Sequence, residues 1–139
     1  MVEDDLNNHE LFRKAFSDAG FKVMICQTAD GDFIKSVTDF DPSIISMDLM
    51  IGKEKESVER DGFDAIELLR NDERTKMIPI MVLTNFVQVE KIKEARDFGA
   101  VDYINLQGQT ITKLPSHFLS YLKNPKRFKP FQPIMMKDE

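Results

Sequence analysis

Residues 43–48 read SIISMD, an apolar run that ends in one aspartate, Asp48. Residues 78–84 read IPIMVLT and end in one threonine, Thr84. Short apolar runs bounded by polar residues are typical of strands buried inside a sheet. The polar residue at the end of each run therefore marks the point where a buried strand reaches the surface.

Segments with helical spacing alternate with segments that have the character of strands. We expect strands at 21–26, 43–48, 78–84 and 101–105, and helices at about 11–19, 32–39, 63–69, 87–98 and 115–123. Strands joined through helices form right-handed crossovers, which produce a parallel sheet covered on both faces. The predicted fold class is therefore α/β, with a doubly wound parallel sheet.

Composition limits the function classes that are open to this chain. Its 139 residues suit one soluble domain, and its net charge of −5 disfavours general nucleic-acid binding. No apolar run is long enough to span a membrane, and no signal-peptide pattern is present. The single cysteine, Cys26, fits a reducing compartment, so we expect a cytoplasmic protein with a buried thiol.

A third polar group lies at the start of the chain, where Glu3, Asp4 and Asp5 follow Met1 and Val2. The carboxyl ends of neighbouring parallel strands share one crevice, and ligands bind there. Carboxylates that converge on such a crevice repel one another unless a cation joins them, and oxygen ligands of this kind suit Mg²⁺. The sequence therefore predicts a magnesium site where the acidic residues at 3–5 lie close to Asp48.

The ordered set of an acidic cluster, a strand-end aspartate and a strand-end threonine resembles the receiver domain of bacterial response regulators. The resemblance covers about residues 1–123 and leaves 124–139 as a C-terminal tail. It implies a five-stranded, flavodoxin-like sheet and a signalling module that is not an enzyme. It also implies that Asp48 accepts a phosphoryl group in a two-component phosphorelay.

The resemblance assigns further roles residue by residue. Glu3, Asp4 and Asp48, with the backbone carbonyl of Met50, would hold Mg²⁺. Thr84 would bind a phosphoryl oxygen, and Tyr103 would change orientation together with it.

Three departures from the family pattern affect these roles. Leu106 stands where the family places a phosphoryl-binding lysine, and Lys113 is the nearest later lysine. The stretch 53–60 enlarges the loop after Asp48, so we expect it to be mobile, either as a lid for a partner or as a tolerated insertion. Only two residues precede Glu3, so the first strand is short: either the start is truncated, or another segment such as 133–136 supplies the pairing.

The function that the resemblance implies is transfer of a phosphoryl group from phosphohistidine to Asp48, with signalling through protein–protein contact. Its partners would be a histidine kinase or histidine phosphotransfer protein and a downstream protein target, without nucleic acid; a weak dimer is compatible with this role. The main alternative is a pseudo-receiver, a binding module of the same fold that signals without phosphorylation. A phosphatase-type hydrolase is disfavoured, because such enzymes place a second acid two positions after the nucleophile, where this chain has Met50.

The tail segment 126–131 mixes cations with aromatic residues. It could contact an acidic partner or anionic lipid, but packing on its own domain is the more ordinary outcome.

Overall fold

The computed structural model describes residues 1–49, 51, 60–85 and 89–131. Its helices and strands, in chain order, are α1 (Leu6–Asp18), α2 (Phe33–Phe40), β1 (Ile45–Met47), α3 (Gly62–Arg70), β2 (Ile80–Thr84), α4 (Val89–Asp97), β3 (Asp102–Asn105) and α5 (Leu114–Lys123). Three short 3₁₀ turns, η1 (Leu106–Gly108), η2 (Ile111–Lys113) and η3 (Pro125–Arg127), flank α5. No helix in these ranges has the length and apolarity that crossing a membrane requires.

The three strands form a parallel sheet in the order β1-β2-β3. Met47 lies opposite Val82, and Thr84 lies opposite Asn105. The N-terminal segment extends this order, because Val2 forms parallel bridges with both Met47 and Cys26. The backbone order is therefore the segment at Cys26, the N-terminus, β1, β2 and β3, which is the flavodoxin-like order 2-1-3-4-5.

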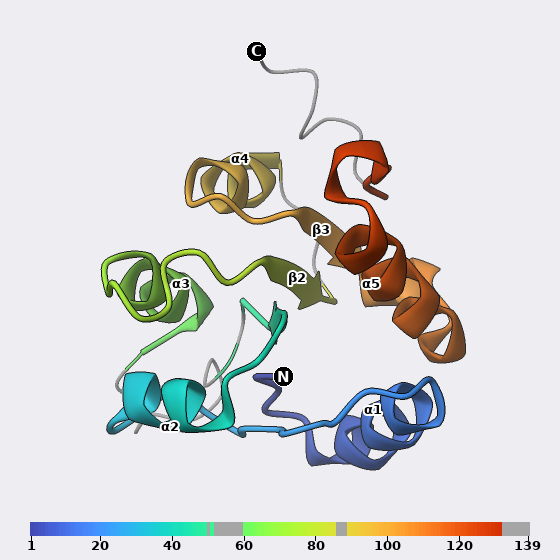
Figure 1. The fold of residues 1–139 in the computed structure, drawn as a ribbon, viewed down its shortest axis with the longest axis horizontal. Helices are drawn as coiled ribbons and strands as arrows, with labels where there is room; N and C mark the ends of the chain where they lie inside the picture. Colours follow the sequence, from blue (N-terminus) through green and yellow to red (C-terminus); the bar gives the residue numbers. More distant parts are fainter. Residues whose placement is uncertain (50, 52–59, 86–88, 132–139) are drawn as a thin grey trace.

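Alternating residues of β2 face two separate apolar layers, as the two-residue period of a strand requires. Ile80 and Val82 pack in the layer that contains α2, α3 and α4, whereas Met81 and Leu83 pack in the layer that contains α1 and α5. Figure 1 shows the same division, with α1 and α5 on one side of the strands and the other helices on the opposite side. The predicted doubly wound α/β fold is confirmed.

The expected strand at 21–26 is much reduced in the structure. Within that range the sheet pairing is the single bridge at Cys26. A strand needs a neighbour along its length, and the N-terminal segment offers only Met1 and Val2 before the chain turns towards α1. Cys26 is half-buried, so the expectation of a buried thiol is only partly met.

Beside this short first strand, the structure holds a largely apolar pocket with a cavity volume of about 60 Å³. It lies beside Met1 and extends from Phe16 of α1 to Phe33 of α2. The Met1 ammonium donates a hydrogen bond to the carbonyl oxygen of Met24 at 2.7 Å. Burial lowers the pKa of this amine from 8.0 to about 6, because the charged form loses its water.

Candidate functional site

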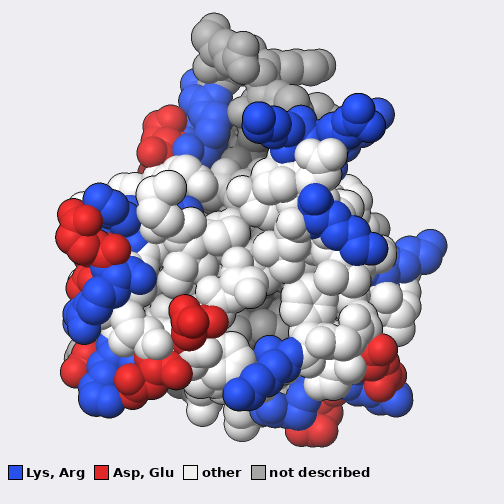
Figure 2. All heavy atoms as spheres, viewed as in Figure 1, with Lys and Arg blue, Asp and Glu red and all other residues white. Residues whose placement is uncertain are grey.

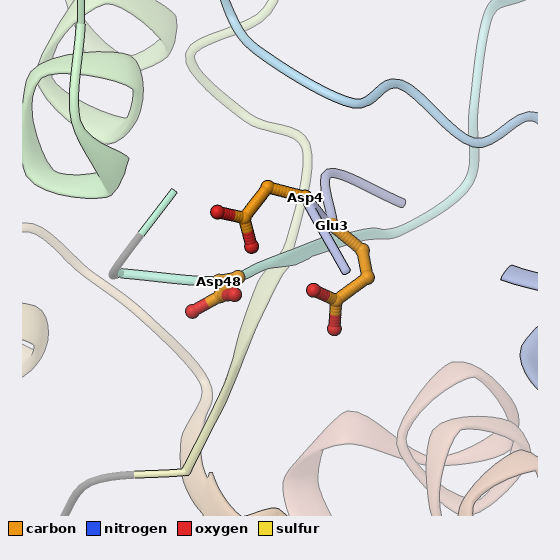
Figure 3. A group of neighbouring side chains, drawn as sticks. All are labelled: Glu3, Asp4 and Asp48. Carbon is orange, nitrogen blue, oxygen red and sulfur yellow. The ribbon is translucent and has the colours of Figure 1, made fainter. Parts of the chain in front are cut away.

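Three carboxylates converge at the carboxyl end of β1 (Figure 3). Glu3, Asp4 and Asp48 each place a side-chain oxygen so that all three atoms lie within 4.8 Å of one another. The backbone fixes this arrangement, since the Val2 N–H bonds to Ser46 O at 2.9 Å and the Asp48 N–H bonds to Val2 O at 3.1 Å. Residues far apart in sequence are thus held together by a parallel ladder.

Glu3 is the most enclosed member of this acidic cluster, with only 5% of its surface exposed. Its Oε2 accepts the N–H of Asp5 at 3.0 Å, and its carboxyl group hydrogen-bonds Asp48. Burial raises the pKa of Glu3, and the charges of Asp4 and Asp5 raise it further, while the hydrogen bonds from Asp5 and with Asp48 oppose the rise. Burial and the neighbouring carboxylates thus make the charged form of Glu3 less favourable here than in water.

Asp5 has a different role from its two acidic neighbours. It is the N-cap residue of α1, and its Oδ1 accepts the N–H of Asn7 at 3.0 Å. The cap directs α1 away from the sheet immediately after the cluster. Asp5 is thus the helix cap next to the site.

The loop after Asp48 returns to the strand end at Gly62. The Gly62 N–H bonds to Leu49 O at 3.3 Å, and an added Cβ would lie 2.4 Å from the Cα of Leu49 and 2.5 Å from the carbonyl oxygen of Asp48. Only glycine permits this approach of two backbones. Asp61 caps α3 in a reciprocal capping box with Asp64, so the helix begins directly beside the candidate phosphoacceptor.

Thr84 and Tyr103 lie on the neighbouring strands and are both 1% exposed. Because Met47 is level with Val82, Asp48 and Thr84 reach the same edge of the sheet. Tyr103 pairs with Val82 and packs in the layer of α2, α3 and α4. The fold brings Thr84 to the carboxyl edge of the sheet. The phosphoryl-binding role of Thr84 and the switching role of Tyr103 stay predictions.

Leu106 follows β3 in the turn η1 and packs against the apolar layer of α1 and α5. The Leu106 side chain therefore contributes to the apolar core. Lys113 lies further along the chain, exposed, at the N-terminus of α5. The assignment of Leu106 to the lysine position of the family stays a prediction.

Met50 and the stretch 53–59, including the predicted mobile part of the loop, lie outside the described residues. On either side of that gap, Ile51 is buried and Arg60 anchors the chain to another loop. The Nη1 atom of Arg60 donates to Ala29 O at 2.7 Å and to Gly31 O at 2.9 Å.

Sequence reasoning missed two histidine contacts. His9 Nε2 lies 2.6 Å from the backbone oxygen of Glu3, so it supports the backbone of the acidic cluster. His117 Nε2 lies 2.7 Å from Oδ2 of the fully buried Asp102. The available signal was Asp102 itself, an acid two residues before Ile104 on the same face of an otherwise apolar strand.

The donor set of the acidic cluster fits a hard divalent cation. Three carboxylates within 4.8 Å of one another offer oxygen ligands and a surplus of negative charge. Burial, and after it the charges of Asp4 and Asp5, raise the pKa of Glu3, and a cation would offset both effects. A cation at this position would hold Glu3, Asp4 and Asp48 in their charged forms.

Comparison with known proteins identifies the family. Residues 1–110 match the sequence profile of the response regulator receiver domain. Two curated relatives are a DNA-binding dual master transcriptional regulator, RpaA, of Synechocystis, 34% identical over 107 residues, and the regulatory protein AtoC of Escherichia coli, 27% identical over 104 residues. Each alignment covers 75% of this chain, but only 40% and 21% of the respective relative. The chain therefore belongs to the receiver-domain family of two-component signalling.

Solved structures support the same fold. The receiver domain of a DNA-binding response regulator from Colwellia psychrerythraea superimposes with a TM-score of 0.73 at 17% identity, over 88% of this chain and 95% of that one. A response regulator from Desulfuromonas acetoxidans gives 0.71 at 20% identity, over 88% and 93%. The flavodoxin-like receiver fold is thus retained at low sequence identity.

Proposed function

We propose that this protein is a phosphoryl-accepting receiver in which Asp48 takes a phosphoryl group from a phosphohistidine. The observation that carries the proposal is the convergence of Glu3, Asp4 and Asp48 at the carboxyl end of β1. In this reaction an Asp48 oxygen attacks phosphorus and the bond from phosphorus to the imidazole nitrogen breaks. The electron pair of that bond stays with the histidine of the donor protein.

Glu3, Asp4 and Asp48 would hold Mg²⁺, with the Met50 carbonyl as the further ligand that the family resemblance implies. Bound there, Mg²⁺ would neutralise the charge that the phosphoryl group brings to the acidic cluster. The cation would favour the ionised forms of Glu3 and of Asp48, and the ionised form of Asp48 is the one that a nucleophile needs. Thr84, at the same sheet edge, would donate its hydroxyl hydrogen to a phosphoryl oxygen.

The proposed partners are a histidine kinase or a histidine phosphotransfer protein, and a downstream protein that recognises the phosphorylated form. Signalling without nucleic acid, a cytoplasmic location, a weak dimer and the division into a receiver at 1–123 and a tail at 124–139 remain part of this proposal. The match to residues 1–110 supports its central part, since family membership implies donors of this kind.

A pseudo-receiver is the second candidate, and the packing of Leu106 favours it. Without a cation at this position, a phosphoryl group on Asp48 would lack a charge-assisted bond that usually stabilises it. Such a protein would keep the fold and bind its partner without phosphorylation.

Intact mass after incubation with acetyl phosphate and Mg²⁺ separates the two functions. We expect the wild type to gain one phosphoryl group and Asp48→Asn to gain none. Asp18→Asn, which changes an exposed aspartate of α1, is the matched control and should behave as the wild type. No gain in the wild type would favour the pseudo-receiver, and an equal gain in Asp48→Asn would place the reaction elsewhere.

A further inference from the structure

The segment after α5 folds back onto its own domain. We call residues 125–131 the strap; it begins with the turn η3 and runs to Phe131. Its two aromatic rings both contact His117 of α5, with centroids 4.7 Å away for Phe128 and 3.6 Å away for Phe131. The Phe131 ring is stacked on the imidazole at an interplanar angle of 10°, and Phe128 meets Tyr121 edge to face.

A buried carboxylate fixes the end of the strap. Oδ2 of Asp102 accepts the backbone N–H of Phe131 at 2.7 Å and contacts His117 Nε2 at 2.7 Å. Its Oδ1 accepts the N–H of Tyr103 at 2.8 Å. Asp102 is fully buried and His117 is 8% exposed, so a carboxylate in this position depends on its hydrogen-bond donors. The strap, α5 and β3 thus meet at one side chain.

These contacts amount to the recognition of a short peptide. Asp102, which contacts His117, accepts the backbone N–H of Phe131. The rings of His117 and Tyr121 contact Phe131 and Phe128, which lie three positions apart in the strap. Between the rings lie Lys129, which is exposed, and Pro130, whose fixed φ favours an extended backbone. The two rings, the proline and the backbone N–H all lie within a short stretch of sequence. A separate peptide with the same pattern could therefore make the same contacts without a covalent link to α5.

The strap is also held by few groups. Phe131 remains 40% exposed despite its stacking. Lys126, Arg127 and Lys129 are exposed as well, and Figure 2 shows Lys and Arg side chains gathered at the top of the view, where Figure 1 places the end of α5 and the strap. Within the described part of the chain, one hydrogen bond to Asp102 and three ring contacts hold the strap beneath a basic, solvated exterior.

We propose that Asp102, His117 and Tyr121 form a peptide-binding site on the face of β3 and α5, and that the strap occupies this site within the molecule. The ligand class is an extended peptide with two aromatic residues three positions apart and a proline before the second. A partner protein that presents such a segment displaces the strap and binds in its place. The site is separate from the acidic cluster, so the proposal does not depend on phosphorylation.

A free peptide must compete with the strap, which is tethered next to the site. A segment joined by a short linker acts at an effective concentration on the order of millimolar, so the wild type resists a free peptide. The probe is a fluorescein-labelled peptide of residues 124–131, and binding is read by fluorescence anisotropy on the full chain. The variant Phe128→Ala/Phe131→Ala empties the site, and Lys126→Ala/Lys129→Ala is a control that changes the strap without touching the site.

We expect the emptied variant to bind the probe at least about tenfold more tightly than the wild type and the lysine control. Adding His117→Ala to the emptied variant should remove that gain, because both rings lose their contact. A probe with its two phenylalanines placed side by side should not bind. Equal binding to the wild type and to the emptied variant would overturn the proposal, as would a gain that survives His117→Ala.

Hydrogen exchange on the unmodified protein provides a second measurement that does not rely on the variants. The Phe131 amide should exchange more slowly than in a free peptide, because it donates to a buried carboxylate. Unlabelled peptide at a concentration well above the millimolar effective concentration of the strap should restore fast exchange at this amide while leaving the amides of β2 protected. An unprotected Phe131 amide, or one whose exchange the peptide does not alter, would overturn the proposal.

Discussion

Glu3 and Asp48 share a hydrogen bond that must change when a cation enters the acidic cluster. Without a cation the burial of Glu3 and the nearby charges oppose ionisation, so the cluster destabilises the folded protein. A cation that binds only the folded state stabilises it by RT ln(1 + [L]/Kd), or about 1.4 kcal/mol at a tenfold excess over Kd. The cluster therefore couples metal binding to the free energy of unfolding.

We predict that millimolar Mg²⁺ raises the melting temperature of the wild type. Asp4→Asn should raise the melting temperature in the absence of Mg²⁺, because it removes one of the repelling charges, and should abolish the response to Mg²⁺. Differential scanning calorimetry of both proteins and of Asp18→Asn provides the comparison. A wild type indifferent to Mg²⁺, together with an Asp4→Asn variant of unchanged stability, would show that the proposed metal site is wrong.

Gly62 is the residue on which the geometry beside Asp48 depends most closely. A Cβ at this position would overlap the backbone of Asp48 and Leu49, so Gly62→Ala should lower the free energy of unfolding by roughly 1–3 kcal/mol. Urea unfolding measures this loss. Glu67→Ala, an exposed site in the same helix, should change stability by less than about 0.5 kcal/mol; equal effects of both variants would contradict the close approach.

At the scale of single residues, local pattern predicted the acidic cluster but not Asp102. The proximity of Glu3, Asp4 and Asp48 could be predicted because the carboxyl ends of parallel strands share one edge of the sheet. Asp102 contacts His117, which lies fifteen residues later in the sequence, on α5. It also accepts the N–H of Phe131, which is 29 residues away in the sequence. Contacts of that kind depend on how α5 sits on the sheet, which strand and helix periodicity do not specify.

At the scale of elements, the turn η1 after β3 carries Leu106, where the resemblance to the receiver family implies a lysine. A cation at position 106 would form a charge-assisted bond with a phosphoryl oxygen, worth roughly 1.5–3 kcal/mol. A ligand shifts a conformational equilibrium only by its differential affinity for the two states, so the leucine should weaken the response to phosphorylation.

We predict that Leu106→Lys enlarges the changes in amide chemical shift at Thr84 and Tyr103 when beryllofluoride, a phosphoryl mimic, is added. Leu106→Met keeps an apolar side chain without the charge and should resemble the wild type. Should the wild type already show full shifts that lysine does not increase, another cation fills this role and the assignment of position 106 is mistaken.

The N-terminal segment should make stability depend on pH. The Met1 amine has a pKa of about 6 when folded and 8.0 as a reference, so between these values the unfolded chain binds more protons. The free energy of unfolding then rises by roughly 2 kcal/mol as pH increases from 6 to 8. Urea unfolding at both values tests this, with the Nα-acetylated protein as the control that lacks the ionisable amine; identical pH slopes would contradict the burial of Met1.

The elements themselves were predicted well where their periodicity was complete. The helices expected at 63–69 and 115–123 correspond to α3 and α5, and the apolar run 78–84 contains β2. The segment 21–26 has a suitable composition for a strand, but pairing depends on the length of its neighbour. With Met1 and Val2 as that neighbour, sheet pairing within 21–26 is limited to one bridge.

At the scale of the molecule, the alternation of strands and helices was enough to predict a doubly wound sheet. Right-handed crossovers and burial on both faces leave few other arrangements, and the two apolar layers on either side of β2 agree with them. The structure adds a back-folded strap on β3 and α5, where the sequence offered only a mixture of aromatic and basic residues. The molecule thus presents an acidic cluster at one edge of the sheet and a candidate peptide site on β3 and α5.

The most direct measurement of the proposed function locates the phosphoryl group on the chain. An acyl phosphate is reduced by borohydride to the corresponding alcohol, so a phosphorylated aspartate becomes homoserine. After treatment with acetyl phosphate and Mg²⁺, reduction and proteolysis, peptide sequencing by mass spectrometry should find homoserine at position 48 and at no other aspartate. Homoserine at another position, or none in a sample whose intact mass shows the phosphoryl group, would contradict the assignment of Asp48.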